Sequence, residues 1–180
     1  QGHPDMKHIP GVDMSSGSLG QGISAAVGMA IAAKLSGDDY RVYTLVGDGE
    51  IQEGQVWEAS MLAAHRKLDN LVVIVDNNNL QIDGAIDEVN SPYPIDKKFE
   101  AFNFHVINID GNDFDQIDAA FKEARTVKGQ PTAIIAKTVK GKGVSFMENQ
   151  ASWHGTAPND EQYAIAMEEL EKAGETLCQK

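Results

Sequence analysis

The run "NLVVIVD" at residues 70–76 constrains the fold more than any other feature of the sequence. Its apolar side chains are continuous rather than alternating, which is typical of a strand buried on both faces. Strands are also predicted at "RVYTLVG", "FHVINID" and "TAIIAKTV", which begin at Arg41, Phe104 and Thr132. Strands buried on both faces, such as the one at residues 70–76, belong to parallel sheets that are covered by helices on both sides.

Helical segments are expected between these strands. Apolar residues at helical spacing predict helices over residues 20–36 and 52–67, and a shorter one over 92–101. Residues 1–19 and 141–158 contain several Gly and Pro residues, which are typical of loops. The alternation of strand and helix predicts one α/β domain over residues 1–180, built on a parallel sheet with helices on both faces.

Two further helices are marked by capping boxes, in which a polar side chain binds the backbone three residues later. Asp113 with Gln116 begins one, and Asn159 with Gln162 begins the last. Residues expected on the apolar, inward side of the predicted helices include Leu62, Phe114, Tyr163, Met167 and Leu170.

Composition excludes several classes of protein. A hydrophobic fraction of 42% indicates a globular chain, and a net charge of −12 argues against a nucleic-acid surface, which requires clustered Lys and Arg. No apolar run is long enough to span a membrane. Cys178 is the sole cysteine, so no internal disulfide can form and a cytoplasmic location is expected. Because the chain starts at Gln1 in a loop-like stretch, we expect the fold to lack its first elements.

Polar, Gly-rich residues follow the predicted strands. In open parallel sheets, ligands bind beyond the carboxyl ends of the strands. Gly47-Asp48-Gly49 places a carboxylate where a helix begins, a position that otherwise favours phosphate. A divalent cation removes this conflict, because it can bind Asp48, other protein oxygens and phosphate together. The next strand exit, Asn77-Asn78-Asn79, supplies amide oxygens; an ordinary turn with an N-cap aspartate is the alternative.

Several blocks in order make the sequence resemble transketolase over almost its whole length, in particular the amino-terminal subunit of split bacterial transketolases. These blocks are "GHPDMKHIPGVDMSSGSLGQGISAAVGMAIA", "GDGEIQEGQVWEA", "DNNNLQIDG" and "KTVKGKGVSFMEN…WHG". The resemblance implies the thiamine diphosphate-binding fold, with thiamine diphosphate and Mg²⁺ as cofactors. Ca²⁺ or Mn²⁺ can also fill the role of Mg²⁺.

The resemblance also implies site residues. Asp48, Asn78 and the Leu80 carbonyl would bind the metal, with a one-residue ambiguity between Asn78 and Asn77. His3 and His154 would be the catalytic residues. The cofactor-binding residues would be Gly17, Ser18, Leu19, Asp48, Gly49, Glu50, Asn78, Leu80 and His154. Glu53 and Glu58 match acidic residues at the family's subunit interface; a solvated helix face is the alternative for Glu58.

By the same resemblance, the chain would transfer a two-carbon ketol unit from a ketose phosphate to an aldose phosphate, within the pentose phosphate pathway and carbohydrate metabolism. In the family, the glutamate that activates the cofactor belongs to a pyrimidine-binding domain, and we expect this chain to lack that domain because no segment resembles it. We therefore expect the partner to be a separate carboxyl-terminal, pyrimidine-binding subunit, and the assembly to hold a homodimer within a heterotetramer. We expect little cofactor binding by the chain alone, and an apolar helix or sheet face left exposed unless a partner covers it.

Three other functions remain open. One is a thiamine enzyme similar to 1-deoxyxylulose-5-phosphate synthase. The second is an inactive, truncated cofactor-binding subunit. The third is dinucleotide binding through "GSLGQG", although this segment lacks the G-x-G-x-x-G spacing.

The remaining polar candidates have no motif support. His8, His65 and His105 are expected to be solvent-exposed or structural, Lys140 and Lys142 to be surface residues unless they meet a substrate phosphate, and Trp153 to be a packing anchor.

Overall fold

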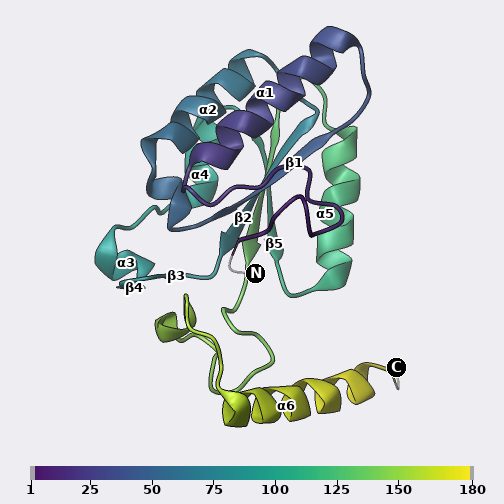
Figure 1. The fold of residues 1–180 in the computed structure, drawn as a ribbon. Coiled ribbons are helices and arrows are strands. Elements are labelled where there is room, and N and C mark those ends of the chain that lie inside the picture. Colours follow the sequence, from purple (N-terminus) through teal and green to yellow (C-terminus); the bar gives the residue numbers. More distant parts are fainter. Residues whose placement is uncertain (1–2, 179–180) are drawn as a thin grey trace.

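The computed structural model describes residues 3–178 and contains a four-stranded parallel sheet with strand order β1-β2-β6-β5 (Figure 1). The predicted fold class is confirmed. The sheet strands are β1 (Val42–Gly47), β2 (Leu71–Asn77), β5 (His105–Asp110) and β6 (Thr132–Lys137). The other elements are α1 (Gln21–Ser36), the 3₁₀ turn η1 (Glu50–Gln52), α2 (Gly54–His65), the short strands β3 (Leu80–Gln81) and β4 (Gly84–Ala85), α3 (Ile86–Val89), α4 (Ile95–Ala101), α5 (Phe114–Thr126), η2 (Ala151–Trp153) and α6 (Asp160–Cys178).

The central strands β2 and β6 explain why this sequence forms a parallel sheet. Their registers pair Val73 with Ala133 and Val75 with Ile135, and these four side chains are buried. Both strands are flanked by other strands and are apolar over most of their length, a composition typical of parallel strands covered by helices. Parallel pairing also brings the polar ends of β1 and β2 to the same edge, where Gly47 lies opposite Asp76.

The two faces of the sheet are covered unequally. One face carries α1, α2 and α4, which enclose the main core around Ile23, Val56 and Phe99. The other carries α5, whose Ala120 and Ala124 pack on the sheet in a much smaller cluster. Beside α5 the sheet stays uncovered, with Leu45 69% exposed above a groove of about 260 Å³. The structure thus shows the exposed apolar sheet face that we expected.

Some predicted boundaries and burial patterns are wrong. The helix predicted over 52–67 is divided at Glu53, whose extended backbone (φ −66°, ψ 129°) separates η1 from α2. The β3–β4 hairpin and α3 were not predicted. Leu62 is 42% exposed and Phe114 is 84% exposed, because no other element covers these positions of α2 and α5.

The last helix, α6, is also exposed where burial was predicted. It extends beyond the carboxyl edge of the sheet, joined to it by the loop after β6 (Figure 1). Asn159 and Gln162 cap it reciprocally as predicted, and the Ser145 hydroxyl and backbone N–H donate to Glu169. The residues predicted inward are nevertheless exposed to 58%, 36% and 44%, namely Tyr163, Met167 and Leu170. Cys178 ends α6, and its side chain lies outside the described part of the chain.

No helix between residues 3 and 178 combines the length and the apolar character needed to cross a membrane.

Candidate cation and cofactor site

Asp48 is the buried centre of the carboxyl edge. It follows β1 directly and is 1% exposed. Its carboxylate accepts hydrogen bonds from the backbone N–H groups of Gly49, at 2.9 Å, and Asn79, at 2.6 Å. The predicted neighbourhood of Asp48 and the Asn triplet is therefore present, because parallel pairing of β1 with β2 places the two strand exits side by side.

The electrostatics of Asp48 fit a cation ligand. Burial raises the pKa of this carboxyl, hydrogen bonds from Asn79 and Gly49 lower it in part, and the charge of Asp76 raises it further. In residues 3–178, no lysine, arginine or histidine forms a salt bridge with Asp48. A buried carboxylate without a positive partner is costly, and a bound cation would remove that cost.

The loop after β2 supplies the other predicted metal ligands. The Asn78 Oδ1 atom accepts from the Leu80 N–H at 3.0 Å, and the Asn78 Nδ2 group donates to Asp76 Oδ2 at 3.3 Å. Asn79 adopts a left-handed conformation, with φ 65°, that turns the chain between them. One carboxylate, an amide oxygen and a carbonyl oxygen suit a hard cation such as Mg²⁺ that also binds phosphate and water.

The donor set does not suit a transition metal held by the protein alone. Within the described residues, no three His, Cys, Asp or Glu side chains lie close enough together to hold a metal ion. The residues present therefore fit a cation that shares its ligands with a phosphate group, as the sequence motif predicts.

Glu50, predicted to bind the cofactor, uses its carboxylate inside the fold. One oxygen accepts from the Gly20 N–H at 2.9 Å and the other from the Gly47 N–H at 3.1 Å. Glu50 thus ties the start of α1 to the end of β1 and places a negative charge at the α1 N-terminus. Any contact with the cofactor would have to coexist with these two bonds.

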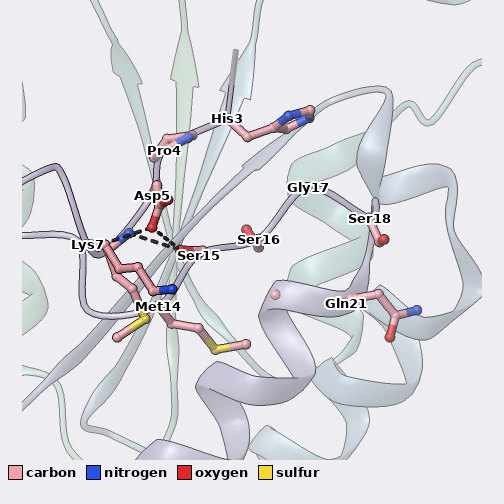
Figure 2. A pocket seen from close by; sticks show the side chains of 12 residues that line it. His3, Pro4, Asp5, Lys7, Met14, Ser15, Ser16, Gly17, Ser18 and Gln21 are labelled. Atoms are coloured by element: carbon pink, nitrogen blue, oxygen red, sulfur yellow. Dashed lines mark hydrogen bonds between the residues drawn. The ribbon is translucent and has the colours of Figure 1, made fainter. Parts of the chain in front are cut away.

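The amino-terminal segment forms a separate pocket of about 790 Å³, shown in Figure 2. His3, Gly17 and Ser18 line it, and a Cβ atom added to Gly17 would lie 3.0 Å from the His3 imidazole. Leu19, at the end of this segment, is 56% exposed. The structure therefore brings His3 together with Gly17 and Ser18, two of the residues predicted to bind the cofactor. The size of the pocket is in the range that binds small molecules.

His154 lies in the loop after β6, beside Lys140. The Lys140 Nζ atom is 3.5 Å from His154 Nδ1. Partial burial and the positive charge of Lys140 both lower the pKa of His154, which favours the neutral imidazole. Trp153 donates to the Phe146 carbonyl and packs against the Phe146 ring in a tilted arrangement, which confirms its packing role. Lys142, by contrast, lies 3.8 Å from Glu148 on the surface.

The other singled-out residues occupy peripheral positions. Glu53 packs against Gly20, where an added Cβ would lie 2.9 Å from the Glu53 Cβ, and Glu58 is exposed on α2. His8 is exposed near Asp5, His65 ends α2, and His105 binds Glu123 at 2.6 Å. An interface role for Glu53 and Glu58 stays a prediction.

Sequence reasoning missed two residues beside the cation site. The Gln81 side chain lies against Gly49 and accepts from Gln52 at 2.7 Å. Tyr93 donates to Asn77 Oδ1 at 2.6 Å; burial and the charge of Asp48 raise the pKa of its hydroxyl. Gln81 falls inside the "DNNNLQIDG" block and could have been marked by that position. Tyr93 belongs to no quoted motif.

Comparison with known proteins decides the family. Residues 1–173 match the model of the family described as "Transketolase, thiamine diphosphate binding domain". The chain belongs to this transketolase family. The parallel sheet agrees with the fold that the transketolase resemblance implied.

Two curated relatives are parts of split transketolases. The chain is 45% identical over 172 residues to "6-deoxy-6-sulfo-D-fructose transketolase subunit SqwG" of Clostridium sp. (strain MSTE9), covering 96% of this chain and 62% of the relative. It is 43% identical over 169 residues to an apulose-4-phosphate transketolase subunit of Actinobacillus succinogenes, covering 94% and 61%. The chain thus spans about three fifths of the length of these relatives.

A solved transketolase shares the fold. The transketolase of Campylobacter jejuni superposes with a TM-score of 0.83 at 38% identity, and the match covers 88% of this chain and 26% of that one. This chain therefore corresponds to part of a larger transketolase structure, and the matched part is the thiamine diphosphate-binding domain.

Proposed function

We propose that this chain is the cofactor-binding part of a split transketolase that transfers a two-carbon ketol unit from a ketose phosphate to an aldose phosphate. The buried Asp48 carboxylate beside the Asn triplet carries the proposal, because it has no positive partner among the described residues. When bound, thiamine diphosphate supplies the carbanion stabilisation that breaking a carbon–carbon bond requires.

The residues of this chain would bind the cation and the cofactor and orient the substrate. Asp48, Asn78 and the Leu80 carbonyl would hold Mg²⁺, and the Gly49 N–H would face the diphosphate. The neutral His154 would accept or donate hydrogen bonds with substrate hydroxyls, and His3 would line the substrate path beside Gly17.

A partner chain is part of this proposal. Both curated relatives are named as subunits, which supports the existence of a partner chain. We propose further that this partner binds the pyrimidine ring and that the assembly holds two copies of each chain. The cytoplasmic location and the pentose phosphate pathway remain predictions. The names of the relatives instead concern a sulfo-sugar and apulose 4-phosphate, so the donor ketose has to be determined by experiment.

The test is a ketol-transfer assay on the full-length protein combined with its partner chain. The donors to compare are xylulose 5-phosphate, 6-deoxy-6-sulfo-D-fructose and apulose 4-phosphate, each with an aldose phosphate acceptor, thiamine diphosphate and Mg²⁺. We expect turnover with at least one donor and none in Asp48→Ala. Turnover of pyruvate instead of these ketoses would favour the 1-deoxyxylulose-5-phosphate synthase-like alternative, and no turnover at all would favour an inactive subunit.

A further inference from the structure

Tyr93 reaches the loop after β2 from a distant part of the chain. It lies between α3 and α4, is partly buried, and its hydroxyl donates to the Asn77 Oδ1 atom at 2.6 Å. The same hydroxyl also faces the Asn79 Oδ1 atom within hydrogen-bond distance. One phenol group therefore contacts the first and the third residue of the Asn triplet.

The chemistry of these groups determines how both contacts can form. A phenol has one proton to donate, whereas its oxygen can also accept. Two amide oxygens, those of Asn77 and Asn79, face this one hydroxyl, so its single proton can go to only one of them. With the proton donated to Asn77, the Asn79 contact is satisfied when its amide is turned to present the NH₂ group. The oxygen and nitrogen of an amide are interchangeable by a half turn, and the hydrogen-bond network decides between them. Tyr93 then fixes both side chains at once.

Asn78 differs from its two neighbours. Its amide bonds only to residues two positions away in sequence, the Leu80 N–H and Asp76. Its oxygen can therefore exchange a local hydrogen bond for a cation without breaking a contact to a segment distant in sequence. Asn79 meanwhile donates its backbone N–H to Asp48 at 2.6 Å, so holding Asn79 also holds the loop against the carboxylate.

We propose that Tyr93 is a positioning residue for the cation site, which ties Asn77 and Asn79 to the α3–α4 segment. This inference rests on the proposed function, because it assumes that Asp48 binds a cation. The transketolase resemblance already implies Asn78 as the side-chain ligand, and the proposal concerns what holds its two neighbours in place. Groups that orient metal ligands in this way commonly contribute about 10- to 100-fold to metal affinity.

The experiment uses the full-length protein in complex with its partner chain. Calorimetric titration of Mg²⁺, at saturating thiamine diphosphate, compares wild type with Tyr93→Phe, which removes only the hydroxyl. The matched control is Tyr40→Phe, because the Tyr40 hydroxyl also makes one hydrogen bond, to the Met29 carbonyl at 3.2 Å, outside the cation site. We expect about a tenfold weaker Mg²⁺ affinity in Tyr93→Phe and no change in Tyr40→Phe. An unchanged affinity in Tyr93→Phe would overturn the proposal.

Substitution within the triplet tests the ligand assignment. Asn78→Ala should lose Mg²⁺ affinity most strongly, and Asn77→Ala should resemble Tyr93→Phe. If Asn77→Ala abolished binding and Asn78→Ala did not, the proposal would be wrong.

A comparison of Mg²⁺ with Ca²⁺ binding distinguishes a positioning role of Tyr93 from a general loss of structure in the Tyr93→Phe variant. Mg²⁺ demands near-octahedral geometry, whereas Ca²⁺ accepts irregular coordination. A loosened triplet should therefore weaken Mg²⁺ more than Ca²⁺, while the thermal midpoint without metal stays close to that of wild type. Equal losses for both metals together with a lower midpoint would contradict a positioning role.

Asp48→Ala distinguishes the failure of this inference from the failure of the proposed function. If Asp48→Ala still bound Mg²⁺ normally, the proposed site itself would be wrong. If Asp48→Ala lost Mg²⁺ and Tyr93→Phe did not, only the inference about Tyr93 would fail.

Discussion

Two aspartates at opposite ends of β2 differ in what balances their charge. Asp69 precedes β2, forms an ion pair with Lys34 and accepts from the Gly129 N–H at 2.9 Å. Burial alone would raise the pKa of Asp69, but Gly129 and Lys34 lower it below its ordinary value. Asp48, beside the other end of β2, also accepts from two backbone groups, yet its pKa is raised.

The difference shows which aspartate belongs to the fold and which belongs to a binding site. The negative charge of Asp69 is balanced within the chain, because Asp69 forms an ion pair with Lys34. Asp48 is more deeply buried and has no such partner among the described residues. A charge that the fold leaves unbalanced is a candidate ligand, although structural networks can also shift a pKa.

The largest expected effect is on stabilisation by the cofactor. At a fixed concentration of thiamine diphosphate, raising Mg²⁺ to 100 times its Kd should stabilise the assembled wild-type enzyme by about 2.7 kcal/mol, and Asp69→Ala should respond equally. Asp48→Ala should gain nothing, because its cation site is broken. Thermal unfolding with and without ligands measures this; a full response in Asp48→Ala would remove the distinction between the two aspartates.

The stability of the ligand-free protein tests the structural role of Asp69. Asp69→Ala should lower the free energy of unfolding by about 1–3 kcal/mol, since the Gly129 N–H loses its acceptor and Lys34 its partner. Urea unfolding measures the loss. Lys34→Met, which leaves Gly129 satisfied, should cost less. An Asp69→Ala chain as stable as wild type would show that this network contributes nothing.

Acid should reduce the contribution of Asp69. The pKa of Asp69 in the folded state lies below its ordinary value of 3.8, so the ionised carboxylate stabilises the folded protein at pH values above 3.8. This stabilisation should decline as the pH falls below 3.8 and disappear once it passes the lowered pKa. The difference between wild type and Asp69→Ala, measured by urea unfolding at several pH values, should narrow accordingly. A constant difference would contradict the ion-pair account.

The smallest expected effect concerns His154. Lys140→Met removes a nearby positive charge, so the pKa of His154 should rise toward its ordinary value of 6.5. Lys142→Met is the control, because Lys142 lies beside Glu148 instead. NMR titration of the His154 ring protons follows the change, and equal titration curves for both variants would show that Lys140 does not act on His154.

The sequence predicted the sheet well because burial on both faces leaves a strong local pattern. The run at residues 70–76 matches β2, Leu71–Asn77, within one residue at each end. Parallel pairing then brought Asp48 and the Asn triplet together as expected. The burial of α6 was predicted wrongly, because periodicity shows which side of a helix is apolar but not whether another element covers it.

The contacts that complete the site could not be predicted from local patterns. Tyr93 meets Asn77 and Asn79 only because α3 and the following segment return to the edge of the sheet. Glu50, similarly, was predicted from its motif to bind the cofactor, but its bonds to Gly20 and Gly47 depend on how α1 packs beside β1. Such contacts join segments that are distant in sequence, and only the folded structure shows them.

Calorimetric titration of Mg²⁺ into the assembled enzyme, at saturating thiamine diphosphate, tests the central claim most directly. The account predicts one cation per copy of this chain in wild type and in Asp69→Ala, and no measurable binding in Asp48→Ala. Normal Mg²⁺ binding by Asp48→Ala would contradict the claim that the unbalanced carboxylate after β1 holds the cation.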